Sequence, residues 1–376
     1  MTHQDRFEAW WAELTRVERW IAIISAVLGV FLVIAFVFGI FQRAFILSVL
    51  AMAGMYILLT MGLNVQWGYA GLVNFSVVAF WGIGAYSAAL LTSSRSPHGL
   101  ELHPITGVVL AIVLSAILAV AIAYPTLRLR ADYLAIATLG FAEIIRIIIL
   151  NEGWLTAGGL GVPAIPSVPT DVPGVETLSI ILGVTPRAIM EVIFVTFLVL
   201  IMFALLRHIQ VSPWGRVLRT IRGDEDLAQA LGKNTFRFKM QAFVLGCIIM
   251  ALAGVFYAHM NRHIEPGDLV PIVTFYVWVA LIIGGTGSNR GAILGGFVVV
   301  LIMRGTRFLN DVLTFIADII PVLGFLGDLN LHAMRLILIG LLVILVVRFR
   351  PQGLLPPQRE HIWPAARRQH HGSGSR

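Results

Sequence analysis

Apolar segments long enough to cross a lipid bilayer recur along this 376-residue chain, and they restrict how it can fold. Hydrophobic residues make up 58% of the sequence, against roughly 45 to 50% in soluble domains. About ten stretches reach the roughly 20 apolar residues that a spanning helix needs. They begin near Trp20, Ala44, Ser76, Thr106, Asp132, Arg187, Met240, Pro271, Gly291 and Ala333. We therefore expect an all-α polytopic bundle of about 8 to 10 spans.

The count of spans stays open at one place. Arg304 and Arg307 divide the stretch 291–321 into two apolar pieces, so the number of passages there can change by one or two. No internal repeat of fixed period is visible, although a degenerate inverted repeat could be hidden in so hydrophobic a sequence.

Basic residues predict the orientation of the bundle. If the chain starts inside and alternates, the cytoplasmic segments hold 19 of the 27 Lys and Arg residues and the external segments hold four. Because basic loops stay inside, both termini are expected in the cytoplasm. Residues 151–186, rich in Pro and Gly, form the predicted external loop. The net charge of +7 reflects this topology, without the basic stripe that nucleic acid requires.

The predicted organisation has three parts. Residues 1–19 form an amphipathic helix in the headgroup layer, because Phe7, Trp10, Trp11, Leu14 and Val17 recur at helical spacing. The transmembrane domain covers 20–348, and 349–376 form a cytoplasmic tail. A secretory signal peptide is not recognisable before the first span. Residues 372–376 are Gly, Ser and Arg only and are left out of the interpretation.

Several chemistries find no support in the sequence. Cys247 is the single cysteine, so an intrachain disulfide or a thiolate metal cluster cannot form. His259 and His263 share a helical spacing but have no evident third metal ligand. The segment 284–291 (GGTGSNRG) lacks the order of a phosphate-binding loop, and its glycines at 287, 291 and 295 suit tight helix contact. We expect neither a metal site nor an enzyme.

One charge-dense stretch, 207–240, interrupts the apolar sequence and must be exposed to water. Within it, the segment from Asp224 to Gly232 carries helix signals. Asp224 can act as the N-cap, acidic residues follow it, and Gly232 suits the left-handed C-terminal position. A helix of eight or nine residues is marginal alone, so another element must pack against it. We interpret this segment as the docking site of a soluble partner.

At this point the chain resembles a known family. The segments 212–222 (SPWGRVLRTIR), 228–232 (AQALG) and 238–243 (FKMQAF) are similar to the cytoplasmic loop of branched-chain amino-acid ABC importer permeases, the membrane subunits of high-affinity leucine, isoleucine and valine uptake. The resemblance implies that the short helix docks on an ATPase. The implied coupling residues are Asp224, Glu225, Asp226, Leu227, Ala228, Leu231 and Gly232. The family's usual glutamate and one of its alanines are replaced here by Asp226 and Leu227.

A second matching stretch, 62–71 (GLNVQWGYAG), concentrates glycine and amide side chains where two spans meet. Irregular backbone at membrane depth persists only where protein buries it or water lines it. We predict a substrate pathway here, while any single glycine is better explained by close helix packing. The predicted pathway residues are Asn64, Gly68, Tyr69, Gly71, Asn74 and Ser76.

Two further segments, 133–146 (YLAIATLGFAEIIR) and 349–355 (FRPQGLL), also resemble this family, and the similarity covers roughly residues 54 to 355. Glu143 and Arg146 lie three residues apart on one helix face, so each can neutralise the other. Charged groups in a span usually face the bundle interior. We therefore interpret them as an internal ion pair.

The resemblance implies a permease in the inner membrane of a bacterial cell that translocates branched-chain amino acids. The implied permease binds no cofactor itself, since ATP and Mg belong to its partners. The implied partners are a second homologous permease, two ABC ATPase subunits, an extracytoplasmic substrate-binding protein and membrane lipid. Urea, short amides and other amino acids remain credible substrates. A stand-alone secondary transporter would need a coupling carboxylate deep in the bundle, and a membrane scaffold would have no continuous polar path.

Overall fold

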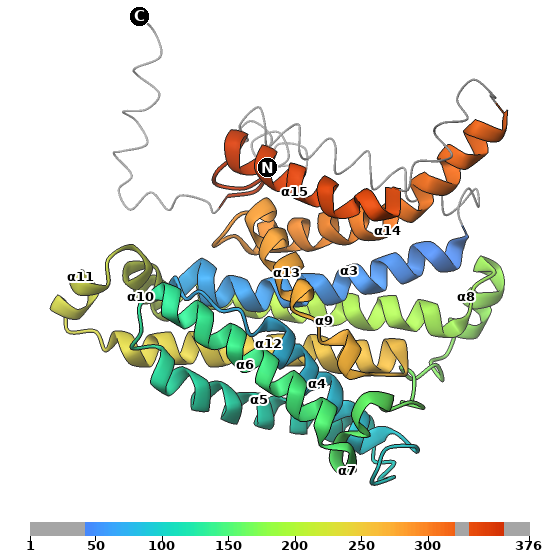
Figure 1. Ribbon diagram of the computed structural model, residues 1–376, viewed down its shortest axis with the longest axis horizontal. Coiled ribbons are helices and arrows are strands. Elements are labelled where there is room, and N and C mark those ends of the chain that lie inside the picture. The colour runs from blue at the N-terminus through green and yellow to red at the C-terminus, as the bar shows by residue number, and fades with distance from the viewer. Residues whose placement is uncertain (1–41, 320–330, 357–376) are drawn as a thin grey trace, which may run out of the picture.

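The computed structural model describes residues 42–319 and 331–356, with side chains described for 42–305 and 336–356. In these ranges all regular structure is helical, apart from one antiparallel bridge between Val162 and Ile264. Six of the helices are long and apolar enough to cross a membrane, so the expected all-α polytopic bundle is confirmed (Figure 1). The amphipathic helix predicted for 1–19, the passage predicted from Trp20 and the end of the tail lie outside the described residues.

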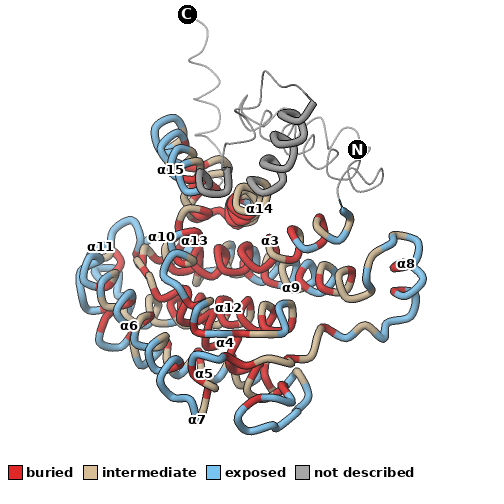
Figure 2. Tube along the Cα trace, turned by 45° about the vertical axis from the view of Figure 1, so that its right-hand side comes forward, coloured by how far each residue is buried: buried red, intermediate tan, exposed pale blue. Residues whose placement is uncertain are grey.

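The centre of the bundle is built from two long and two short helical passages. Figure 2 shows the buried residues concentrated on these elements. They are α3 (Arg43–Leu63) with the π-helix η1 (Asn64–Tyr69), α4 (Val77–Thr92), α12 (Thr235–Asn261) and α13 (Pro271–Gly284). A Cβ on Gly84 would lie 1.9 Å from the carbonyl oxygen of Ala251, and a Cβ on Gly254 would lie 1.9 Å from that of Trp81. Glycine therefore allows α4 and α12 to pack backbone against backbone.

Three long helices form the outer part of the bundle. They are α5 (Pro104–Thr126), α6 (Ala131–Asn151) and α9 (Pro186–Val211). Each exposes large apolar side chains on the face turned away from the core, such as Ile117, Ile136 and Phe197. Apolar side chains on the surface of the bundle suit a membrane environment, because lipid is as apolar as the core.

The loop predicted to be external contains only short elements. They are α7 (Gly153–Thr156), the 3₁₀ turn η2 (Gly158–Leu160) and α8 (Val175–Leu182), and a further 3₁₀ turn, η3 (Pro266–Asp268), precedes α13. These elements lie at the opposite end of the bundle from α10 (Pro213–Gly223) and α11 (Glu225–Ala230) (Figure 1). The loops predicted to be cytoplasmic and external therefore gather at two separate ends, called here the inner and the outer end.

The stretch whose span count was open forms one continuous helix, α14 (Asn289–Ile319), which is followed by α15 (Leu331–Phe349). A Cβ on Gly295 would lie 1.8 Å from the carbonyl oxygen of Ala280, and a Cβ on Gly291 would lie 2.5 Å from that of Gly284. The predicted glycine contact between the helices flanking this turn is confirmed. Gly287 instead has φ +84° and forms part of the turn itself.

Candidate functional site

The predicted pathway residues gather at the break between α3 and α4. The α-helix α3 passes into the π-helix η1, and residues 71–76 then run without helical structure until α4 begins at Val77. The backbone amide of Phe75 donates to Thr138 Oγ1 at 2.9 Å. Thr138 lies seven residues into α6, about 10 Å from the inner end of that helix. The irregular backbone therefore lies at membrane depth, where other helices surround it.

One group of side chains in the break meets at the start of α14. Asn64 Nδ2 donates to Asn289 Oδ1 at 3.1 Å, and the Tyr69 hydroxyl donates to the same oxygen. Asn64 Oδ1 accepts the backbone N–H of Gly287 at 2.8 Å. Asn289 Nδ2 in turn donates to Gln210 Oε1, on α9, at 3.2 Å. The end of the broken helix is thereby tied to both α9 and α14.

A second group centres on Gln66. Gln66 Nε2 donates to the carbonyl of Phe243 on α12 at 2.8 Å, and Gln66 Oε1 accepts from Asn74 Nδ2 at 2.8 Å. Asn74 Oδ1 accepts the backbone N–H of Ser76 at 2.8 Å and its hydroxyl at 2.5 Å. All three side chains are fully buried. Their polar groups are satisfied by each other and by backbone, which fixes the break in place.

Asn64, Tyr69, Asn74 and Ser76 were predicted as pathway residues from the sequence. Gln66 and Asn289, which complete the two groups, were not. Gln66 lies inside the same glycine-rich stretch. The signal for Asn289 was its position directly after the glycines at 284–287. A role of these residues in contacting substrate stays a prediction.

The structure requires glycine at positions 68 and 71 for different physical reasons. A Cβ on Gly68 would lie 2.0 Å from Asn64 Oδ1 and 2.7 Å from the backbone nitrogen of Gly287, so the close approach of the turn requires glycine. Gly71 has φ +73°, a left-handed conformation that side chains disfavour. The stem of Arg222 also lies against it, 3.4 Å from where a Cβ would stand.

Aromatic rings cover the outward side of the break. Phe75 stacks on Trp278 with centroids 5.0 Å apart, and Trp67 packs on the same indole at 4.6 Å. The indole N–H of Trp278 donates to the carbonyl of Asn74 at 3.0 Å. Phe275, 5.7 Å from Phe75, is 46% exposed. The break thus reaches the surface of the bundle through an aromatic cluster on α13.

At the inner end, the predicted docking segment forms a capped helix. Asp224 Oδ1 accepts the backbone N–H of Leu227 at 2.9 Å, and Gly232 has φ +75°, so both predicted caps are present. The helix is shorter than expected, Glu225–Ala230, because Leu231 already leaves helical geometry with ψ 12°. Ala228 is buried, and Glu225 forms an ion pair with Lys239 of α12. These contacts supply the packing that so short a helix needs.

Two leucines, one in α11 and one directly after it, point outward. Leu227 and Leu231 are 51% and 64% exposed. Leu231 also borders a hollow of about 250 Å³ between α10 and α11. The hollow is lined by Pro213, Arg216, Val217, Thr220, Ala228, Leu231 and Lys233. Exposed leucines beside a hollow, on a charged and water-exposed segment, are typical of a surface that a protein covers.

Arg222 joins the helical pair α10 and α11 to the break. Its guanidinium donates to the carbonyl of Gly68 in η1 and to Thr286 Oγ1 at 3.1 Å. Burial lowers the pKa of Arg222, but arginine titrates so far above neutrality that it remains charged. Gln210, at the end of α9, adds a bond to the carbonyl of Gly287 at 3.3 Å. Long side chains therefore connect the water-exposed helices to the end of the broken passage.

The ion pair in α6 forms, but not in the bundle interior. Arg146 Nε lies 2.9 and 3.1 Å from the two carboxylate oxygens of Glu143. The side chains of Glu143 and Arg146 are 41% and 29% exposed, because both lie on the outward half of α6. The predicted pairing of Glu143 with Arg146 is therefore confirmed, but the two charges neutralise each other on the outward face of a spanning helix and do not face the bundle interior.

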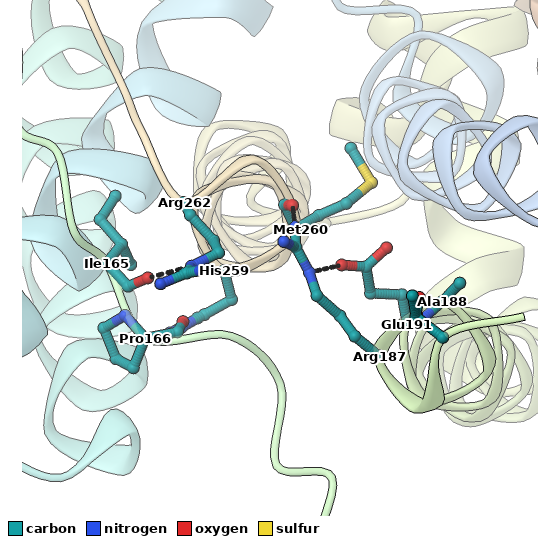
Figure 3. Close-up of polar contacts among 9 residues, drawn as sticks. Ile165, Pro166, Arg187, Ala188, Glu191, His259, Met260 and Arg262 are labelled. Atoms are coloured by element: carbon teal, nitrogen blue, oxygen red, sulfur yellow. Dashed lines mark hydrogen bonds and ion pairs between the residues drawn. The ribbon is translucent and has the colours of Figure 1, made fainter. Parts of the chain in front are cut away.

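The outer end of α12 is held by a separate set of contacts (Figure 3). Arg187 donates to Glu191 Oε1 at 2.6 Å and also reaches the carbonyl of Met260. His259 Nδ1 lies 2.7 Å from the carbonyl of Pro166, and Arg262 Nε donates to the carbonyl of Ile165 at 3.3 Å. His263 lies 3.7 Å from Glu265. Among the described residues, no group of three or more His, Cys, Asp and Glu is arranged to hold a metal ion.

Comparison with known proteins adds an independent observation. Residues 45–347 match the family model described as "Branched-chain amino acid transport system / permease component". The high-affinity branched-chain amino acid transport system permease protein LivM of Salmonella typhimurium is 30% identical over 328 residues, 84% of this chain and 71% of that protein. LivM of Escherichia coli is 30% identical over 320 residues, 82% and 69% of the two chains.

A second type of permease matches as well. The high-affinity branched-chain amino acid transport system permease protein LivH of Escherichia coli is 30% identical over 257 residues, 65% of this chain and 79% of that protein. No solved structure resembles the chain closely enough to count as a match.

Proposed function

Because this chain belongs to the branched-chain amino acid transport system permease family, we propose that it is a membrane subunit of an ABC importer. It moves branched-chain amino acids such as leucine, isoleucine and valine across the membrane. The energy comes from ATP hydrolysed by separate subunits. The observation that carries the proposal is α11, a capped helix with exposed leucines that is linked through Arg222 to the broken passage.

The geometry supports a route for the transmission of force. An ATPase that closes would push on Leu227 and Leu231, and α11 would move with α10 because Ala228 is buried at their contact. Arg222 then transmits the movement to the carbonyl of Gly68 and to the turn at Thr286. Such a rigid-body shift of packed helices is a known kind of switching transition. It would displace η1 relative to α14 and so change the network around Asn289.

The proposal includes the partners and the orientation. The inner end faces the cytoplasm of a bacterial cell and receives one of two ATPase subunits. The outer end faces an extracytoplasmic binding protein, and both termini are cytoplasmic. A second, homologous permease completes the path, in keeping with the match to both LivM and LivH. Substrate contacts are assigned to Asn64, Tyr69, Asn74 and Ser76 in a conformation in which the break is open.

The docking role of α11 is tested by Leu231→Arg in the complete transporter. Leu231 is exposed, so the substitution leaves the fold intact. Burying an unpaired charge in an interface core should lower ATPase co-purification and binding-protein-stimulated ATP hydrolysis by roughly tenfold or more. The control is Leu160→Arg, a more exposed leucine at the outer end, which should leave ATPase co-purification unchanged. Undiminished stimulation in Leu231→Arg would refute the docking role.

A further inference from the structure

The ion pair on α6 lies where lipid would be an unsuitable neighbour. Glu143 is twelve residues from Ala131 and eight from Asn151, so it lies about 18 Å from one end of the helix and about 12 Å from the other. Both charged side chains are partly exposed on the outward half of α6. Charged groups at this depth rarely face lipid, because no water is present to solvate them. The outward half of α6 is therefore expected to contact polar groups of another molecule.

The other two outer helices differ from α6 in this respect. The whole of α5, from Pro104 to Thr126, contains no Asp, Glu, Lys or Arg. In α9 the charged residues lie near its two ends, and no charge falls between Glu191 and Arg207. The exposed faces of α5 and α9 can therefore be covered by lipid tails. Among the described outer helices, α6 is the one whose exposed face carries charge near its middle.

The exposed face of α6 also has the form of a helix-packing seam. One line of residues along this face is spaced alternately by four and three, the repeat that keeps one face toward a neighbouring helix. They are Ile136, Gly140, Glu143, Ile147 and Leu150. A Cβ on Gly140 would meet nothing within 4 Å, so the glycine leaves a notch in this face. Small residues at such positions let two membrane helices approach closely.

We propose that this seam on α6 is the contact surface for the second permease subunit, with the Glu143–Arg146 pair facing polar groups of that partner. The proposal rests on the permease pair of the proposed function. ATPases and binding proteins act outside the membrane, so only a membrane-spanning chain can reach Glu143. The aromatic cluster beside the break reaches the surface of the bundle at Phe275. The backbone amide of Phe75, in the same cluster, donates to Thr138 of α6. The pathway break therefore lies next to the interface between the two permeases.

The test uses a photo-crosslinking amino acid placed singly at Ile136 or Ile147 in the complete transporter. The controls are Val113 on α5 and Phe197 on α9, which are exposed apolar positions near the middle of the other two outer helices. We expect adducts with the second permease from both α6 positions and none from the control positions. The proposal is overturned if the α6 positions give no protein adduct, if they capture a second copy of this chain, or if α5 or α9 captures the second permease instead.

A second measurement separates a protein interface from a lipid face. The double variant Glu143→Leu/Arg146→Leu makes α6 wholly apolar in this region. If the pair bonds to the partner, co-purification of the second permease should fall roughly three- to tenfold. If the pair faces lipid, assembly should be unchanged or improved. Both measurements use transporter that shows ATP-driven uptake, so failure at α6 overturns the interface alone, whereas absence of ATP-driven uptake overturns the proposed function.

Discussion

The two ends of α12 and its neighbours are held by different kinds of contact. At the outer end, backbone groups at 162–166 and 258–264 are bonded to one another or capped by nearby side chains, and the Arg187–Glu191 pair lies against them (Figure 3). At the inner end, single long side chains connect separate elements, with Arg222 reaching η1 and Gln210 reaching the turn at Gly287. The outer contacts include paired backbone groups, whereas Arg222 and Gln210 act through single side chains. We infer that movement begins at the inner end.

The largest effect is expected at the inner end. Arg222→Met keeps the stem that packs on Gly71 but removes the guanidinium that bonds Gly68 and Thr286. Loss of hydrogen bonds from a charged group, about 1.5 to 3 kcal/mol, should lower uptake by roughly tenfold or more. ATPase co-purification and basal hydrolysis should be retained, so fewer substrates are moved per ATP. The measurement is uptake and phosphate release in the same vesicles.

The control for Arg222 is Arg237→Met, an exposed arginine at the start of α12. It should leave the ratio of substrate moved to ATP hydrolysed unchanged. An unaltered ratio in Arg222→Met as well would remove Arg222 from the route of transmission.

At the outer end, a substitution should lower the stability of the protein but should not change the ratio of substrate moved to ATP hydrolysed. Arg187→Met leaves the mostly buried carboxylate of Glu191 without its partner, which should lower the free energy of unfolding by about 2 kcal/mol. Thermal unfolding in detergent measures this. The double variant Arg187→Met/Glu191→Leu should recover most of the loss, and the ratio of uptake to hydrolysis should stay normal in both. A changed ratio would show that the outer end also transmits movement.

The smallest effect concerns the backbone of the break. Gly71→Ala places a side chain at φ +73° against the stem of Arg222, which should destabilise the protein by about 1 to 2 kcal/mol. Gly223→Ala, at the end of α10, has no atom near the added Cβ and no positive φ, so it should be neutral. If the two variants unfold at the same temperature, the left-handed conformation assigned to Gly71 is not required.

Local features were predictable because their physical causes lie close together in the sequence. The caps of α11 at Asp224 and Gly232 follow from residues within one short segment. The spans follow from apolar runs, and the glycine contact between α13 and α14 follows from the spacing of 291 and 295. The partners of the break were missed because Asn64 and Asn289 are 225 residues apart in sequence.

Which face of a spanning helix points outward could also not be predicted from the sequence. In a soluble protein, polar residues mark the outward face of a helix. In α6 almost every side chain is apolar, so the pattern does not tell which side meets the core. Glu143 and Arg146 were expected to face the interior because charged groups in a span usually do, whereas packing against α4 and α5 turns them outward. The continuity of α14 through Arg304 was undecided because two arginines interrupt its apolar pattern.

The central claim is that this chain moves solute only when an ATP-hydrolysing partner acts on its inner end. The direct measurement is uptake of labelled leucine into lipid vesicles that contain either the purified chain alone or the complete transporter with ATP and binding protein. We predict accumulation by the complete transporter, its loss when ATP is omitted, and no accumulation by the chain alone, even with an ion gradient. Robust gradient-driven accumulation by the chain alone would contradict the account.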